Sequence, residues 1–166
     1  MRANRQPTLR SEGGHERSQV GMVELFFDLV FVFAITQLSH GLLEQLTPLG
    51  ALHTGVLFIG AWWLWIYTTW CTNWLNPAAT PVRQLLFVLM LLALVMAAAL
   101  PHSFAERGLV FALAYVAQHL LRSAYMVHAF GAVSGHGRNF IRIFAWLAVS
   151  GTCWVLGGLS DPQSRL

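Results

Sequence analysis

The sequence predicts an all-α fold, a polytopic transmembrane helical bundle of about five membrane-spanning helices with its N-terminus in the cytoplasm. Of its 166 residues, 56% are hydrophobic and 10% are charged, and the mean hydropathy is +0.57. Soluble domains carry about 25% charged residues, so lipid is the better solvent for most of this chain. Apolar runs of about 20 residues, the length that crosses a hydrocarbon core as a helix, occur five times.

These runs divide the chain into elements. We expect helices over 22–46, 53–75, 82–100, 107–130 and 139–159, which form a transmembrane bundle over 21–160. Short turn-forming segments such as TPLG and NPAATP separate the helices, so neighbouring helices should be antiparallel. We predict that residues 1–20 form a disordered, Arg-rich cytoplasmic tail and that residues 161–166 form a C-terminal tail. The first apolar run is too long for a cleaved signal peptide.

The arginines predict the orientation of the chain, because cytoplasmic loops are rich in basic residues. With the N-terminus inside, the cytoplasmic segments hold Arg2, Arg5, Arg10, Arg17, Arg83, Arg138 and Arg142. The outer segments hold Arg107 and Arg165, and Arg122 falls within the fourth helix. The basic pI, about 9.4, therefore reflects topology and contact with anionic lipid headgroups. We predict the lipid bilayer as a partner and no nucleic acid.

The first helix opens with VELFFDLVFVFA, in which two carboxylates interrupt an apolar run. Glu24 and Asp28 are four residues apart and share one helix face, and Asp28 lies one turn deeper in the membrane. A carboxylate at that depth costs several kcal/mol unless it is protonated, hydrated or paired. Asp28 is therefore expected to face the bundle interior or a water-filled cavity.

A second polar cluster lies in the outer half of the same helix. Gln37, His40 and Glu44 recur at spacings of three and four, on nearly the opposite face from Asp28. A metal site or a proton-access site is one interpretation of this cluster. No HExxH or paired-cysteine motif supports a defined ligand geometry, so ordinary interfacial polarity is the favoured interpretation and we predict no metal.

The second helix carries an aromatic stripe over more than half its length, formed by Trp63, Tyr67, Trp70 and Trp74. Aromatic belts normally occupy the ends of a span, so this stripe predicts a helix-packing face. The wall of an apolar ligand pocket or a cation pocket is the alternative. The third helix is almost wholly apolar, and Ala93 and Ala97 allow another helix to approach closely.

The fourth helix offers a partner for Asp28. Tyr115, His119, Arg122 and Met126 form one stripe, and the predicted topology places Arg122 at nearly the depth of Asp28. We therefore predict contact between the first and fourth helices, with Asp28 and Arg122 paired directly or through water. His119 and Tyr115 would continue this polar path towards the membrane centre. The alternative is a purely structural ion pair that holds two helices in register.

Sequence motifs favour no enzyme class. No glycine-rich phosphate loop precedes a lysine, and no GxSxG serine occurs. The chain contains no lysine, which excludes a retinal Schiff base within it. We predict a protein that is not an enzyme, with no catalytic residue and no cofactor.

The opening helix resembles a known family. The segment ELFFDLVFVFAITQLSH, Glu24–His40, is similar to the first helix of the bacterial low temperature requirement protein A (LtrA) family. WWLWIYTTWCTNWLNP, Trp62–Pro77, is similar to that family's second helix and the following loop. The resemblance implies a multi-pass inner-membrane protein associated with growth in the cold, with no established reaction or substrate. Because members are typically much longer, this chain resembles an N-terminal portion.

Two functions are consistent with these observations. The first is a transporter or channel for protons, ions or a small polar solute, in which Asp28, Arg122 and His119 line a polar path. The alternative is a non-transporting membrane sensor or assembly scaffold in cold adaptation, whose buried charges are structural. Five helices suit a two-repeat transporter poorly, so further helices of a longer chain or a homo-oligomer are expected to complete any path.

Overall fold

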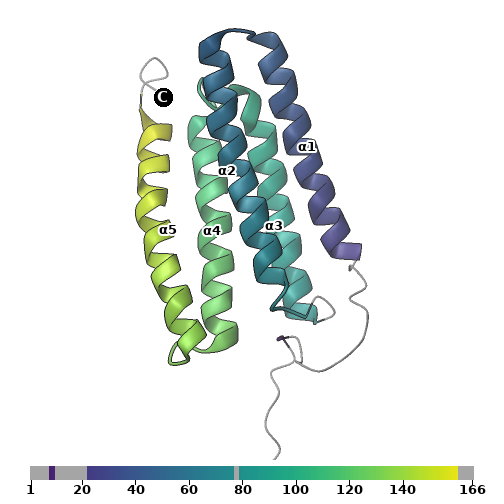
Figure 1. Ribbon diagram of the computed structural model, residues 1–166, viewed down its shortest axis with the longest axis vertical. Coiled ribbons are helices and arrows are strands. Elements are labelled where there is room, and N and C mark those ends of the chain that lie inside the picture. Colours follow the sequence, from purple (N-terminus) through teal and green to yellow (C-terminus); the bar gives the residue numbers. More distant parts are fainter. Residues whose placement is uncertain (1–7, 10–21, 77–78, 161–166) are drawn as a thin grey trace, which may run out of the picture.

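The computed structural model describes residues 8–9, 22–76 and 79–160, and within these ranges it forms five α-helices (Figure 1). These are α1 (Met22–Glu44), α2 (Pro48–Thr72), α3 (Thr80–Ala99), α4 (Gly108–Phe130) and α5 (Gly135–Leu159), and a short 3-10 helix, η1 (Leu100–His102), follows α3. Successive α-helices run antiparallel to one another. The predicted all-α helical bundle is confirmed.

Three helices begin earlier than their apolar runs predict: α3 begins at Thr80 instead of residue 82, and the differences are larger for α2 and α5. α2 begins at Pro48 instead of residue 53, and α5 begins at Gly135 instead of residue 139. The starts of α2 and α5 have capping side chains: the hydroxyls of Thr47 and Ser134 accept a backbone N–H from the first turn, at 3.0 and 2.9 Å. Pro48 stands at the first helical position, where its missing N–H costs nothing. Capping therefore extends both helices beyond the residues that hydrophobicity marks.

Four of the helices in the described ranges are long and apolar enough to cross a membrane: Leu25–Glu44, Pro48–Thr72, Thr80–His102 and Gly135–Leu159. The predicted fifth span, α4, has 23 residues but does not reach this level of hydropathy. Its polar residues Gln118, His119 and Arg122 are 1–2% exposed, so they lower the hydropathy of the helix without facing lipid. The chain is a helical membrane protein.

The outer surface of the bundle is apolar. Large hydrophobic side chains are exposed on all five helices, among them Phe26 on α1, Ile59 on α2, Leu91 on α3, Leu113 on α4 and Trp146 on α5. A soluble domain would cover such surface with charged residues, whereas lipid chains solvate it directly. The apolar helices therefore imply a lipid environment.

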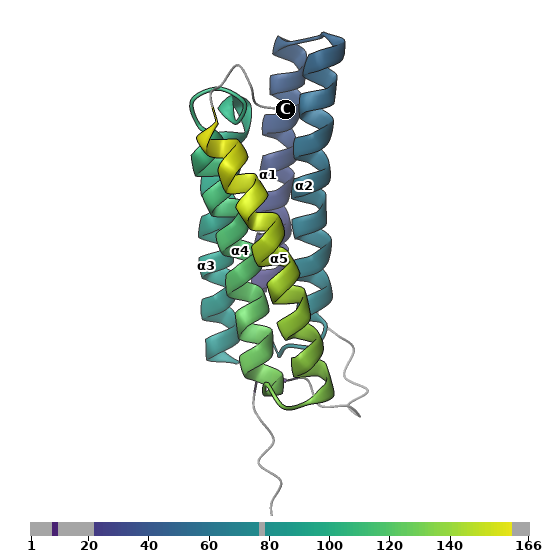
Figure 2. The ribbon, with the colours of Figure 1, turned by 90° about the vertical axis from the view of Figure 1, so that its left-hand side faces the viewer.

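α4 has the central place in the packing. It packs against α3 and α5 and also contacts α2, whereas α1 packs against α2 and α3. Figure 2 shows α5 tilted across α4, with α1 and α2 side by side. Small residues bring α4 and α5 close together: a Cβ atom added to Gly158 would lie 3.0 Å from the carbonyl oxygen of Gly108. A larger residue at Gly158 would require the backbone of α4 to shift by a few tenths of an ångström, so glycine favours this close spacing.

The predicted tails, 1–20 and 161–166, lie outside the described residues apart from Thr8 and Leu9. Leu9 pairs with Leu75 in an isolated antiparallel bridge, and the N–H of Asn76 donates to the carbonyl of Thr8 at 2.9 Å. These contacts join a short piece of the N-terminal segment to the loop after α2.

Candidate functional site

Arg122 lies inside the bundle on the side of α4 that faces α2, and its side chain is 1% exposed. Its Nη1 donates to the hydroxyl of Thr68 and, at 3.4 Å, to the carbonyl of Leu64. Its Nη2 lies 2.7 Å from Nδ1 of His119, and its Cζ lies 4.2 Å from the centre of the Tyr67 ring. We call these five residues the arginine cluster. The four residues that contact the guanidinium do so through uncharged groups: a carbonyl, a hydroxyl, an imidazole and an aromatic ring.

Helical spacing explains how the cluster forms. Leu64 and Thr68 are one turn apart on α2, and the Thr68 hydroxyl donates to the Leu64 carbonyl at 2.8 Å. Because the Thr68 hydroxyl donates its hydrogen to Leu64, its oxygen is free to accept a hydrogen bond from Arg122. His119 and Arg122 are three residues apart on α4 and therefore share a face. The Tyr115 ring meets the His119 ring at 4.6 Å and 75°, so the structure brings three predicted site residues together.

The contacts of His119 define its protonation. A guanidinium only donates hydrogen bonds, so Nδ1 of His119 must accept, and the proton of the neutral ring lies on Nε2. This tautomer is inferred from the hydrogen bond. Nε2 of His119 and Nε of Arg122 are both buried and have no hydrogen-bond partner among the described residues. The cluster thus holds a positive charge and two N–H donors without acceptors.

Two further buried polar residues, Gln118 and Ser123, lie on α4. The Tyr67 hydroxyl lies 3.4 Å from the hydroxyl of Ser123, which is completely buried. Gln118 donates to the carbonyl of Ala114 at 3.2 Å and to Sδ of Met96 on α3 at 3.8 Å. Sequence reasoning missed Ser123, Gln118 and Thr68 because uncharged polar residues are common in helices. Gln118 and Ser123 could have been noticed because they are next to His119 and Arg122 in the chain.

The predicted direct pair of Asp28 with Arg122 is wrong. Oδ1 of Asp28 accepts a hydrogen bond from Nε1 of Trp65 at 2.8 Å, and no ion pair joins Asp28 to Arg122 in the described part of the chain. Asp28 reaches Trp65, whereas Arg122 reaches the carbonyl of Leu64, the preceding residue of α2. The two charges therefore contact neighbouring residues of α2, and α2 stands between them.

Asp28 instead lines a groove between α1 and α2, about 500 Å³ in volume. Its walls also include Ser39 and Thr36, whose hydroxyls donate to carbonyls of their own helix, together with exposed Trp62 and Phe58. Asp28 is half-buried there. The predicted continuous path from Asp28 through Arg122 to His119 is therefore divided between two sides of α2.

The remaining polar predictions lie apart from the cluster. Glu24 belongs to α1, but its side chain lies outside the described part of the structure. Gln37 is half-buried, and His40 and Glu44 are exposed. Among the described residues, no group of three His, Cys, Asp or Glu side chains is arranged to hold a metal ion.

The predicted aromatic stripe of α2 divides into two parts. Trp63 is 55% exposed. Tyr67, Trp70 and Trp74 form a ladder of ring contacts, with centroids 6.0 and 6.4 Å apart. Trp70 also contacts Phe140 of α5 at 5.7 Å. Trp70 and Trp74 remain 41% and 36% exposed, so the ladder contacts α5 without being enclosed, and Tyr67 joins it to the arginine cluster.

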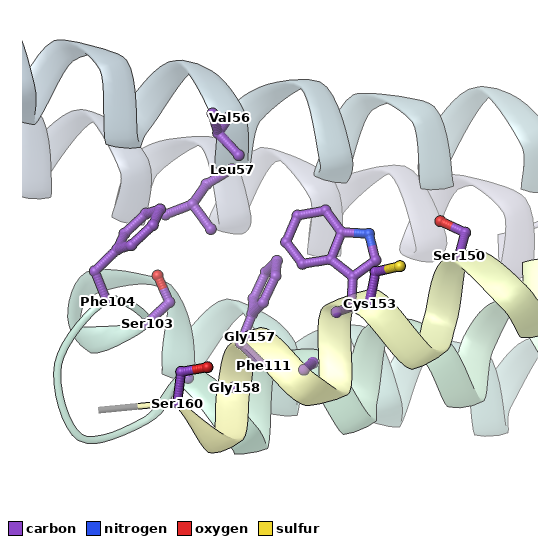
Figure 3. Close-up of a pocket in the computed structure, with 13 residues that line it drawn as sticks. Val56, Leu57, Ser103, Phe104, Phe111, Ser150, Cys153, Gly157, Gly158 and Ser160 are labelled. Atoms are coloured by element: carbon purple, nitrogen blue, oxygen red, sulfur yellow. The ribbon is translucent and has the colours of Figure 1, made fainter. Parts of the chain in front are cut away.

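A cleft of about 320 Å³ opens between α2, α4 and α5, close to η1, and we call it the end cleft. Figure 3 shows Phe104 and Phe111 projecting into the space between α5 and α2, with Ser150 and Cys153 on the α5 side. Cys153 is exposed and Cys71 is buried, and both are free thiols. The end cleft is mainly apolar, and none of the side chains that line it is charged.

Comparison with known proteins places these features in context. Residues 19–166 match the family model described as bacterial low temperature requirement A protein (LtrA). The chain is 45% identical over 168 residues to an uncharacterized protein of Rhizobium meliloti (strain 1021). The match covers 100% of this chain and 41% of that relative, so the chain spans about two fifths of the length of the curated relative it matches. No solved structure matches the chain.

Proposed function

The chain belongs to the bacterial low temperature requirement A family, and from that premise we propose that it forms part of an inner-membrane transporter or channel and is not an enzyme. In this proposal the arginine cluster holds an ion or small polar solute inside the membrane. Arg122 supplies the charge, and His119 supplies a second N–H donor. Adaptation to cold would then depend on movement of that solute.

The buried charge of Arg122, which no acidic side chain in the described ranges neutralises, supports this proposal most strongly. Burying a charge costs several kcal/mol, and a structural role would favour neutralising it with a carboxylate. Asp28, the acid that the sequence predicts at a similar depth, bonds to Trp65 instead. Charged residues inside membrane proteins are rare and usually mark solute or ion pathways. An unneutralised arginine is therefore better explained by a ligand than by packing.

A sensor or assembly scaffold is the second candidate, and the contacts of Arg122 with α2 favour it. The guanidinium of Arg122 bonds to Thr68 and Leu64 and stacks over Tyr67, so it joins α4 to α2 at one level. Under this alternative the cluster is a structural tie, and cold adaptation would depend on assembly or signalling.

The length of the relative supports a larger assembly. Because the chain covers 41% of the relative, we propose that further helices of a longer protein, or a second copy of this chain, complete the solute path. The exposed apolar surfaces of α1 and α5 are suitable for packing against additional helices as well as lipid.

Flux through liposomes tests the proposed transport. The purified chain, its Arg122→Gln variant and its Arg83→Gln variant would be reconstituted separately and tested for proton, sodium, potassium and chloride flux. Arg83 is exposed near the start of α3, so it controls for loss of one positive charge. We expect flux that folded Arg122→Gln loses and Arg83→Gln keeps. Absence of flux from folded wild type for every ion would favour the sensor or scaffold.

A further inference from the structure

We propose that the arginine cluster binds a small monovalent anion, which reaches it through the end cleft. This proposal rests on the transport function above and names its substrate class.

The chemistry of the cluster selects the ligand. The cluster presents one positive charge and two buried N–H donors, Nε of Arg122 and Nε2 of His119, without acceptors among the described residues. An anion supplies acceptors and neutralises the charge, whereas a neutral solute would leave the charge uncompensated. A cation would be repelled. One net charge matches a monovalent ligand, so chloride, nitrate and bicarbonate are the relevant class.

Packing limits the size of this ligand. Leu64 and Ser123 are completely buried, and Arg122 itself is 1% exposed. Interiors packed this closely have little spare volume. An anion of one to four heavy atoms is therefore more compatible with the cluster than a large organic acid.

A continuous row of side chains connects the end cleft to the cluster. Trp154 lines the cleft, and its ring centroid lies 5.0 Å from that of Tyr115. Tyr115 in turn lies 4.6 Å from His119, which bonds to Arg122. Phe111, Tyr115, His119 and Arg122 follow the same face of α4 at spacings of four, four and three. The end cleft and the cluster therefore lie along one helix face.

Trp154 and Tyr115 form the partition between the two. A Cβ atom added to Gly60 of α2 would lie 3.7–3.8 Å from both rings, an ordinary van der Waals distance, so this glycine leaves room for about one methyl group beside them. The edges of aromatic rings carry partial positive charge, which attracts anions. Because the residues that line the cleft are uncharged, selection of the anion would occur at Arg122.

Thermal unfolding in detergent tests binding without requiring transport. The melting temperature would be measured in sodium chloride and in sodium gluconate at equal ionic strength, because gluconate is too large for the cluster. At chloride tenfold above its dissociation constant, we expect a rise of roughly 3–6 °C for wild type and for Arg83→Gln. Arg122→Gln should show no such difference. An equal rise in Arg122→Gln, or none in wild type, would overturn the anion site.

The wild-type protein alone tests anion binding if Arg122→Gln does not fold. Its melting temperature should rise when chloride replaces gluconate and stay unchanged when potassium replaces sodium. A dependence on the cation and not on the anion would refute the proposal.

The cleft route has its own test, through the exposed thiol of Cys153. Chloride binding would be followed by tryptophan fluorescence after chloride is mixed with the protein. A bulky water-soluble maleimide on Cys153 should slow this binding by at least tenfold. Cys153→Ser treated in the same way should keep the original rate. An unchanged rate after complete labelling would exclude the end cleft as the route.

The outcomes separate this proposal from the transport function. Chloride binding without ion flux would contradict transport and keep the anion site. Proton or cation flux without chloride binding would contradict the anion site and keep transport.

Discussion

Replacing Arg122 with methionine separates a functional charge from a structural tie. Methionine is long, flexible and apolar, so it fills most of the arginine's space without its charge. In sodium gluconate, where the proposed ligand is absent, we expect the free energy of unfolding of Arg122→Met to stay within about 2 kcal/mol of wild type.

Two opposing contributions give this magnitude. The substitution removes a buried charge without leaving a carboxylate unpaired, because Asp28 bonds to Trp65, and this relief contributes several kcal/mol. Against it, Nδ1 of His119 loses its donor, which costs about 1–3 kcal/mol, and the contact with the Tyr67 ring, about 0.5–2 kcal/mol, is lost. Thr68 keeps its bond to Leu64. The contributions therefore largely cancel.

Denaturant unfolding in detergent, followed by tryptophan fluorescence, measures this change. Arg83→Met provides the control, since it removes an exposed arginine. A loss of more than about 4 kcal/mol, comparable to breaking a buried ion pair, would refute the reasoning. Arg122 would then be a structural tie between α2 and α4.

Three further predictions concern other parts of the bundle. Gly158→Ala should lower the free energy of unfolding by about 1–2 kcal/mol, because its Cβ would press on the backbone of α4. Gly157→Ala, whose Cβ would enter open space, should raise the free energy of unfolding by about 0.5–1 kcal/mol. Denaturant unfolding measures both changes. Asp28→Asn should leave the chloride-dependent rise in melting temperature unchanged, because its groove is separate from the arginine cluster. Mass spectrometry should find Cys153 labelled by maleimide in the folded protein and Cys71 labelled only after unfolding.

The all-α fold could be predicted because a membrane helix needs a long apolar run, and such runs are visible in the sequence. The stripe of Tyr115, His119 and Arg122 could be predicted for a related reason, since residues three and four apart on a helix share a face. The exact helix starts depended on capping by Thr47 and Ser134, which hydropathy does not register.

The pairing of Asp28 with Arg122 could not be predicted correctly from depth alone. Topology and helical rise indicate how deep each residue lies, but not which helices are neighbours around the bundle. The structure places α2 between the two charges, and the indole N–H of Trp65 donates a hydrogen bond to the carboxylate of Asp28. Trp65 is one of several aromatic residues in the second helix, and nothing in the sequence distinguishes it as the partner of Asp28.

Solute binding in the membrane requires access of water and solutes to the arginine cluster from outside the bundle. Its most direct test replaces Ser123, completely buried beside Tyr67, with cysteine in a chain carrying Cys71→Ser and Cys153→Ser, embedded in membranes. A small anionic thiol reagent should modify Ser123→Cys, and chloride should protect it, whereas Ala93→Cys in the apolar core of α3 stays unmodified. If Ser123→Cys is as unreactive as Ala93→Cys in the folded protein, the cluster is dry and does not exchange solutes with water.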